Sequence, residues 1–236
     1  MLTLPHHSRN TLNDPQIAGV LSHLHEDAKK DRYVFVRAMP AILLGRLRGR
    51  SVFESAEPYL SKAYLPVSES LGRMMYQVAR TARARNIVEF GSSYGISSIY
   101  LATAARLVGG KFTGSEKEPE KCQIALQNLS DAGLSSCSDI REGDAMESFA
   151  SLEGPIDFVF LDGWKAIYVP MLKLLEPKLA PGAIIMADNI KTFPKTLKPF
   201  VDYVTEPENG YETTLLPFES GVTLSTWNGG LDERGV

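Results

Sequence analysis

The sequence has few of the residues on which many catalytic and structural sites depend. Its two cysteines, Cys122 and Cys137, are too few and too far apart for a CxxC motif or a disulfide framework, so reduced thiols are expected. All four histidines lie within the first 25 residues. The rest of the chain therefore has no histidine for a Ser-His-Asp hydrolase or for a histidine-ligated zinc site.

Long apolar runs and an excess of one charge are also missing. No run reaches the length of a membrane span, and the first 15 residues lack the apolar core of a secretory signal. The 25 basic and 28 acidic residues leave a formal net charge of -3, which gives no overall attraction to nucleic acid or to anionic membranes. We therefore expect a cytoplasmic protein that binds neither nucleic acid nor a membrane. Its 236 residues are enough for one large domain, or for a domain with an appendage.

The first quarter of the chain differs in texture from the rest. Residues 1–62 are expected to form a helical extension, a cap or a dimer contact, ahead of a main domain over residues 63–236. Residues 29–50 carry seven Lys or Arg residues against one Asp, interleaved with apolar residues. Such a stretch can contact a membrane surface or RNA, but in an acidic chain a solvated helix face or a subunit contact is favoured. We therefore expect a homodimer.

Helix-like and strand-like blocks alternate along the main domain. A capping serine begins a helical pattern over residues 68–83. The β-rich runs that follow are 86–90, 111–116, 138–143, 156–162 and 183–189, mostly separated by helix-length segments. This alternation predicts an α/β fold with parallel strands joined by right-handed crossovers. Two last runs, 211–218 and 221–227, predict an antiparallel hairpin that closes one edge of the sheet.

A glycine-containing turn follows the first predicted strand. In VEFGSSYGISS (88–98) the strand ends at Phe90, and Gly91 and Gly95 permit a tight backbone path into a helix. Backbone amides and the Ser97 hydroxyl at such a helix start can bind a carboxylate or a phosphate. A glycine pair alone equally indicates a simple turn, and the lack of GxGxxG disfavours a dinucleotide-binding fingerprint.

Acidic residues follow the second and third predicted strands. Glu116 ends the second strand, where α/β folds place a carboxylate that binds ribose hydroxyls. Asp144 and Ala145 follow the third strand and suit an adenine edge, although the aspartate equally suits a helix N-cap. Together with the first turn, these positions predict a bound nucleoside with its charged end near Gly91 and Ser97.

Polar residues also follow the fourth and fifth strands, which end in Asp162 and in Asp188–Asn189. In a parallel sheet these tips lie side by side, so two carboxylates and one amide oxygen converge. An all-oxygen set suits Mg²⁺, Mn²⁺ or Ca²⁺ rather than Zn²⁺ or Cu²⁺. Lys165 follows Asp162 by three residues and can act as a base beside such a cation, although most lysines are simply exposed.

These motifs resemble those of the cation-dependent catechol and caffeoyl-CoA O-methyltransferases, within the class I S-adenosylmethionine-dependent methyltransferases. The resemblance extends from about Val67 to the C-terminus and is strongest in FLDGWKAIY and ADNI. It implies a Rossmann-like methyltransferase fold: a seven-stranded, mostly parallel sheet with a C-terminal antiparallel hairpin. Trp164 suits the catechol branch, because the caffeoyl-CoA branch usually has an acid there, whereas Gly163 is smaller than the family pattern leads us to expect.

The resemblance also implies roles for single residues. Cofactor contacts would come from Val67, Glu89, Gly91 and Ser97 at the methionine part, Glu116 at the ribose, Asp144 and Ala145 at the adenine, and Asp162. The divalent cation, Mg²⁺ before Mn²⁺ or Ca²⁺, would be bound by Asp162, Asp188 and Asn189, with Lys165 as the base. The implied reaction moves a methyl group from S-adenosylmethionine to a hydroxyl of a catechol-like, phenolic small molecule.

Other functions stay open at this point. One is a metal-independent methyltransferase of the same fold. Another is an NAD-binding oxidoreductase, against which the missing GxGxxG and the Asp-Asn pair argue. A third is a non-catalytic module that binds a nucleoside or RNA through residues 29–50. For a methyltransferase, the acceptor pocket is expected from residues 190–200, the N-terminal helices, Trp164, Tyr168 and Trp227.

Overall fold

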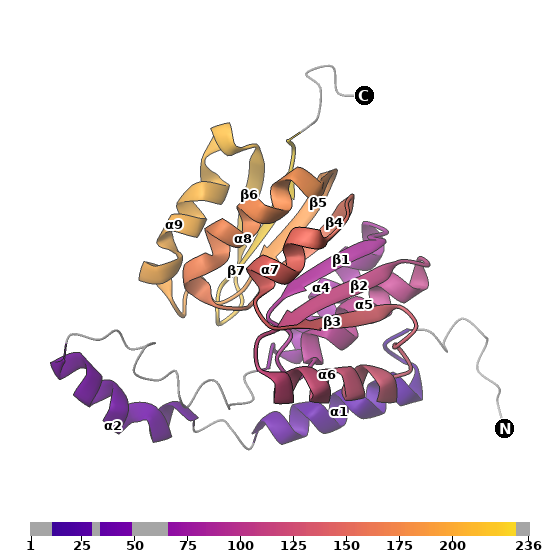
Figure 1. Cartoon of the computed structure of the whole chain (residues 1–236), viewed down its shortest axis with the longest axis horizontal. Helices are drawn as coiled ribbons and strands as arrows, with labels where there is room; N and C mark the ends of the chain where they lie inside the picture. Colours follow the sequence, from indigo (N-terminus) through magenta and orange to yellow (C-terminus); the bar gives the residue numbers. More distant parts are fainter. Residues whose placement is uncertain (1–10, 30–33, 49–65, 230–236) are drawn as a thin grey trace.

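The computed structural model describes residues 11–29, 34–48 and 66–229, in which helices cover both faces of one twisted sheet (Figure 1). The helices are α1 (Pro15–Ala28), α2 (Val34–Leu47), α4 (Glu69–Thr81), α5 (Ile96–Leu107), α6 (Pro119–Asp131), α7 (Ala145–Ser148), α8 (Tyr168–Leu175) and α9 (Pro194–Thr205). The strands are β1 (Asn86–Phe90), β2 (Lys111–Glu116), β3 (Ser138–Glu142), β4 (Ile156–Leu161), β5 (Leu179–Ala187), β6 (Tyr211–Leu216) and β7 (Val222–Trp227). The predicted boundary at residue 62 and parts of the basic stretch 29–50 lie outside the described residues.

The seven strands lie in the order β3-β2-β1-β4-β5-β7-β6. Strands β1 to β5 are parallel, whereas β7 runs antiparallel to both of its neighbours. Phe90 is in register with Leu161, which is in register with Ala187, so β1, β4 and β5 end level. This confirms the predicted fold, and it places the residues after these three strands at one edge of the sheet.

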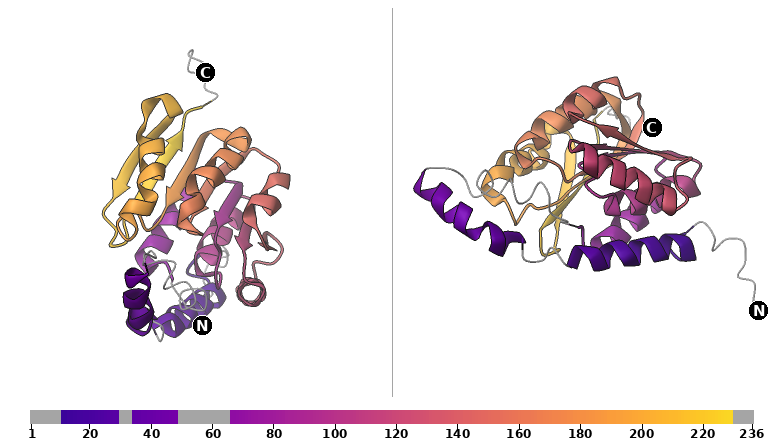
Figure 2. Two further views of the ribbon diagram at one scale, coloured as in Figure 1. Left: turned by 60° about the vertical axis from the view of Figure 1, so that its left-hand side comes forward. Right: turned by 60° about the horizontal axis from the view of Figure 1, so that its bottom comes forward.

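Helices cover both faces of the sheet (Figure 2), and apolar side chains fill the layer between the helices and each face. One layer packs α1, α4, α5 and α6 against one face through residues such as Met75 and Ile99. The other packs α7, α8 and α9 against the opposite face through residues such as Leu172 and Phe200. Because β4 is covered on both sides, its run IDFVFL is apolar at nearly every position instead of alternating.

Helix α1 packs against the main domain. Its residues Ile17, Leu21 and Leu24 are buried in the layer that α5 and α6 also form. The Gln16 side-chain amide donates a hydrogen bond to the Asp131 carbonyl at the end of α6, at 2.6 Å. This helix is thus part of the core, and the division of the chain at residue 62 stays a prediction.

Helix α2 is set apart from the sheet (Figures 1 and 2). Its side chains Met39, Leu43, Leu44 and Leu47 are all exposed. Helix α2 spans 14 residues, and no helix among the described residues is long and apolar enough to cross a membrane.

Candidate active site

The turn after β1 brings two loops into backbone contact. The Gly91 amide donates to the Ser115 carbonyl at 3.2 Å, and its φ of 93° favours glycine. A β-carbon at position 91 would lie 2.5 Å from the Gly163 Cα atom, in the loop after β4. Position 91 therefore requires glycine for two independent reasons, its dihedral angle and its neighbour.

Glu89 is fully buried near the end of β1. Its Oε2 atom accepts hydrogen bonds from Ser92 Oγ, at 2.7 Å, and from Ser98 Oγ. Its Oε1 atom is buried and has no hydrogen-bond partner among the described residues. Burial raises the pKa of Glu89 to about 7, against the lowering effect of the serine hydroxyls. A carboxylate oxygen left unpaired in this way suits a cationic or hydrogen-bond-donating group of a ligand.

A pocket opens between this turn and the tip of β4. It is lined by Pro66, Val67, Gly91, Ser92, Ser93, Tyr94, Ile96, Ser97 and Asp162. Four of the predicted cofactor residues, Val67, Gly91, Ser97 and Asp162, thus come together around one space. Glu89 adjoins the pocket through Ser92, which donates to its carboxylate.

The remaining predicted cofactor residues are not among those that line this pocket. The Glu116 carboxylate accepts hydrogen bonds from the backbone amide of Ser93, at 2.7 Å, and from that of Glu118, at 2.9 Å. It therefore holds the turn after β1 against the tip of β2. Asp144 accepts from the Met146 amide at 2.7 Å, so its alternative prediction as an N-cap is confirmed. Ala145 is buried at the start of that short helix.

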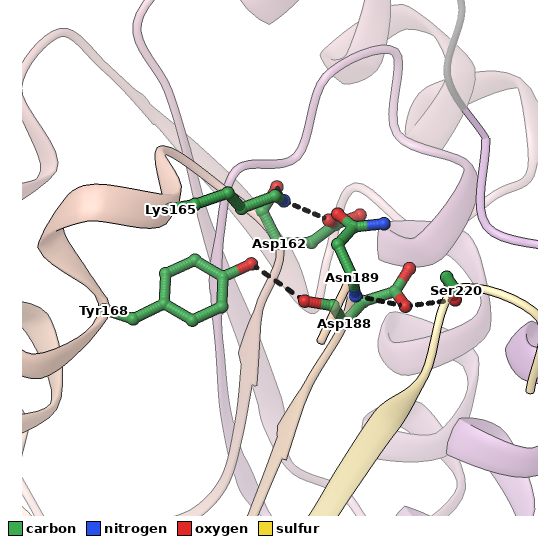
Figure 3. A network of polar contacts seen from close by, with 6 residues as sticks. All are labelled: Asp162, Lys165, Tyr168, Asp188, Asn189 and Ser220. Carbon is green, nitrogen blue, oxygen red and sulfur yellow. Dashed lines mark hydrogen bonds and ion pairs between the residues drawn. The ribbon is translucent and has the colours of Figure 1, made fainter. Parts of the chain in front are cut away.

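The four residues predicted for catalysis and cation binding lie beside the pocket, at the tips of β4 and β5 (Figure 3). Lys165 Nζ donates to Asp162 Oδ1 at 2.8 Å, and the two side chains are only 8% and 17% exposed. Burial raises the pKa of Asp162 to about 6; Lys165 opposes this shift, and the negative charge of Asp188 adds to it. The two carboxylates therefore lie within electrostatic reach of each other.

Asp188 is held by hydrogen bonds at one of its two carboxylate oxygens. Its Oδ1 atom accepts hydrogen bonds from the backbone amide of Asn189, at 2.6 Å, and from Ser220 Oγ, at 2.5 Å. Asn189 has a φ of 69°, in the left-handed region that asparagine tolerates better than most residues. Figure 3 shows the side-chain amide of Asn189 on the side of Asp162 and Lys165.

The donor set at these tips fits a hard divalent cation. In the described part of the chain, neither Asp188 Oδ2 nor the Asn189 side-chain amide makes a hydrogen bond, so both retain free oxygen lone pairs. Residues 11–29, 34–48 and 66–229 contain no cluster of three or more His, Cys, Asp or Glu residues suited to a metal. Asp162, Asp188 and the side-chain amide oxygen of Asn189 could together offer an all-oxygen donor set of the kind that Mg²⁺ prefers.

Tyr168 was expected in the acceptor pocket, and the structure places it below the site instead. It is fully buried and packs edge-on against Phe90 and Phe200, with ring centroids 6.3 and 5.4 Å apart. Its hydroxyl donates to the Asp188 carbonyl at 3.5 Å. Tyr168 therefore supports the backbone at the tip of β5, and the prediction that it lines a pocket is wrong.

Trp227 was also expected in the acceptor pocket and lies elsewhere. Trp227 ends β7, which runs antiparallel to β5. Asp188 lies beside the start of β7, so Trp227 is at the other end of that strand. There its ring packs on Tyr211, with centroids 4.7 Å apart. The third aromatic residue, Trp164, is next to Lys165 and 40% exposed, which leaves it accessible to an acceptor.

Three serines contribute to the site without having been predicted from the sequence. Ser92 and Ser98 hold Glu89, and the serine-rich string GSSYGISS was the signal that could have indicated them. Ser220 reaches Asp188 from the loop between β6 and β7. No local motif marks Ser220, because its contact depends on where the hairpin lies in the folded sheet.

The chain is similar to known methyltransferases in part of its sequence and in its fold. A family model described as a methyltransferase domain matches residues 88–190. Catechol O-methyltransferase of Niastella koreensis is 31% identical over 144 residues, which cover 59% of this chain and 62% of that protein. Its counterpart of Mycobacterium tuberculosis is 31% identical over 127 residues, covering 53% and 57%. The solved structure of the O-methyltransferase TomG from Streptomyces achromogenes, in complex with S-adenosylmethionine, superposes with a TM-score of 0.65 at 23% identity, covering 83% and 90%.

Residues 88–190 of the chain are thus similar to a methyltransferase domain, and the fold is that of a solved O-methyltransferase structure. The matched family segment runs from β1 to the residue after Asn189, so it contains the pocket turn and both polar strand tips. The matched segments span about three fifths of those two curated relatives.

Proposed function

We propose that this protein transfers a methyl group from S-adenosylmethionine to one hydroxyl of a catechol-like molecule, with a divalent cation and with Lys165 as the base. One observation carries the proposal. Asp162 borders the pocket lined by Gly91 and Ser97, and the same residue contacts Lys165 and lies near Asp188. A cofactor in that pocket and an acceptor at the strand tips would thus be neighbours.

The residues of the pocket suit S-adenosylmethionine. The unpaired Oε1 of Glu89 would attract the ammonium of its methionine part, and the amides after Gly91 would bind the carboxylate. The carboxylate of Glu116, which ends the neighbouring strand β2, would accept from the ribose hydroxyls. Asp144 and Ala145 follow β3 and would border the adenine. These residues would hold the cofactor in the pocket that Asp162 also lines.

The strand tips would bind and orient the acceptor. Asp162, Asp188 and Asn189 would hold the cation, which when bound would chelate two vicinal oxygens and favour ionisation of one hydroxyl. Lys165 Nζ, which donates to the Asp162 carbonyl at 3.0 Å, would first release a proton to solvent and would then accept the hydroxyl proton. The oxygen would then form a bond to the methyl carbon while the carbon–sulfur bond breaks, which leaves S-adenosylhomocysteine. The exposed face of Trp164 would border the acceptor ring.

The test is a methyl-transfer assay with the full chain. Catechols with two vicinal hydroxyls and matched phenols with one would be incubated with S-adenosylmethionine, with Mg²⁺ or with a chelator. We expect methylated product from the vicinal diols only, lost with the chelator and restored by added Mg²⁺. Equal turnover in the chelator would overturn the role of the cation, and transfer to none of the acceptors by a chain that binds S-adenosylmethionine would overturn the acceptor class.

The ion pair at the β4 tip supports a second candidate, a metal-independent methyltransferase. Lys165 Nζ already lies 2.8 Å from Asp162 Oδ1, so an ammonium group occupies part of the space near the predicted ligands. In that reaction Lys165 would stabilise the acceptor oxygen by its charge. The same chelator experiment separates the two candidates.

We also infer that the protein forms a homodimer through α2. The apolar side chains exposed on this helix, among them Leu43 and Leu47, support this, because exposed apolar patches commonly mark contact surfaces. Sedimentation analysis of the full chain and of a Leu43→Glu/Leu47→Glu variant would test it. A dimeric variant, or a monomeric parent chain, would contradict the inference.

A further inference from the structure

The loop between β6 and β7 reaches across to the predicted cation site. Ser220, in this loop, donates a hydrogen bond from its hydroxyl to Asp188 Oδ1 at 2.5 Å. The backbone amide of Asn189 donates to the same oxygen at 2.6 Å (Figure 3). Asp188 is 5% exposed, so these two bonds replace much of the water that its carboxylate would otherwise bind. They also fix the rotation of the carboxylate about its own axis.

The loop that carries Ser220 is firmly attached to the segment after β5. The amides of Lys191 and Thr192 donate to the Ser220 carbonyl at 2.8 and 3.3 Å, and the Ile190 amide donates to the Gly221 carbonyl at 2.9 Å. Gly221 has a φ of 72°, and a β-carbon there would lie 2.7 Å from the Lys191 nitrogen. Ser220 is thus held at a set distance from Asp188 by backbone contacts that do not depend on its own side chain.

We propose that Ser220 is a positioning residue that holds Asp188 Oδ1 and so directs Oδ2 to the cation. This rests on the proposed function, because it assumes a cation at the strand tips. Both of the donors described above bind Oδ1, whereas Oδ2 accepts no hydrogen bond within the described residues. A carboxylate bound in this manner offers one oriented oxygen instead of two interchangeable ones, which lowers the ordering cost of cation binding.

The same part of the sheet supplies a matched control. Thr223, three residues after Ser220 at the start of β7, is 2% exposed, and its hydroxyl has no hydrogen-bond partner among the described residues. The substitution Thr223→Val removes a buried hydroxyl of the same kind without removing a contact to Asp188. Ser220→Thr is the rescuing variant, because it keeps the hydroxyl.

The experiment is a titration of the full chain with Mn²⁺ alone, followed by the paramagnetic signal of the free ion, in the presence of S-adenosylhomocysteine. No turnover occurs, so cation affinity is measured separately from catalysis. We expect Ser220→Ala to weaken Mn²⁺ binding by roughly 10- to 100-fold, as loss of a residue that orients a metal ligand typically does. Ser220→Thr should recover most of the affinity, and Thr223→Val should retain the parent value.

The outcomes separate this inference from the proposed function. If the parent chain binds Mn²⁺ and Asp188→Ala does not, but Ser220→Ala binds like the parent, the positioning role is overturned and the proposed function stands. If Thr223→Val weakens binding as much as Ser220→Ala does, the effect is general loosening of the hairpin, which also overturns it. If the parent chain binds no Mn²⁺, the cation-dependent function fails and the role of Ser220 fails with it.

Discussion

The ring of Phe90 occupies the space that a side chain at position 163 would need. A β-carbon there would lie 2.5 Å from the Cε1 and Cζ atoms of Phe90 and 2.7 Å from Cε2. The ring cannot easily move, because it is buried and packs edge-on against Tyr168. The small residue between Asp162 and Trp164, unexpected from the family resemblance, is thus explained by the large residue at the end of β1.

This relationship predicts coupled effects on stability. Gly163→Ala should lower the free energy of unfolding by about 1–3 kcal/mol, because it overpacks a filled site. Phe90→Leu should also be destabilising alone, but it opens space at position 163. In the double variant the combined loss should therefore be smaller than the sum of the single losses. Denaturant unfolding of all four proteins measures this coupling, and strictly additive losses would show that the two positions do not compete for space.

Loss of the Lys165 amine should affect catalysis far more than cofactor binding. We expect Lys165→Met to reduce kcat by roughly 100- to 10,000-fold, the range for removal of a general base, with little change in the affinity for S-adenosylmethionine. Steady-state kinetics and a binding titration measure the two quantities. Lys198→Met is the matched control, because Lys198 is exposed and, within the described residues, pairs only with Asp202 on α9. A Lys165→Met enzyme with a parental kcat would contradict the assignment.

Asp188 should act through the cation. In Asp188→Asn, one charged oxygen is replaced by an amide of almost the same shape, so the Mg²⁺ concentration for half-maximal activity should rise by at least about 10-fold. High Mg²⁺ should restore part of the activity, which it should not do for Lys165→Met. Activity measured against Mg²⁺ concentration distinguishes the two variants. An unchanged Mg²⁺ dependence would exclude Asp188 as a ligand.

The buried carboxyl of Glu89 predicts a pH dependence of stability. Burial raises its pKa in the folded protein to about 7, above the ordinary value of 4.5, so the folded state keeps a proton that the unfolded state loses. The ligand-free protein should therefore lose stability as the pH rises from about 4.5 to 7, by on the order of 3 kcal/mol from this group. Glu89→Gln should remove this part of the slope. Unfolding curves of both proteins across that pH range provide the measurement, and parallel profiles would contradict it.

Helix α1 should be as important for stability as the helices that follow it. Ile17 is fully buried against the core, so Ile17→Ala should lower the free energy of unfolding by about 2–5 kcal/mol. Gly19 lies on the same helix and a β-carbon there would contact nothing, so Gly19→Ala should instead stabilise by up to about 1 kcal/mol. If Ile17→Ala unfolds like the parent chain, α1 does not belong to the cooperative core.

The sequence predicted much of the sheet because its parallel strands are apolar runs with polar ends. The bounds of β1 and β2 agree with prediction at 86–90 and 111–116. The start of β5 was missed by four residues, at Leu179 instead of 183. Pro181 and Gly182 follow that start and are typical of a turn, yet here they lie in a strand whose register with β4 shifts. A local pattern cannot show that pairing continues on the far side of such an irregularity.

The site was predictable where chemistry lies directly after a strand. Asp162, Asp188 and Asn189 could be placed together because parallel strands end at one edge. Tyr168 and Ser220 could not be placed, because their roles depend on tertiary packing. Tyr168 turns inward from the start of α8 to meet the Asp188 carbonyl, and Ser220 arrives from a hairpin 32 residues further along the chain.

The strand order has a consequence for how the protein is made. Strand β5 pairs with β7, the last strand, and not with β6, which precedes it. During synthesis the edge of β5 therefore stays unpaired until residues 222–227 have emerged, and an unpaired edge is prone to pair with other chains. The hairpin that carries Ser220 is made after both β4 and β5. A nascent chain can thus form the pocket turn early, but it completes the strand-tip site only after this hairpin has emerged.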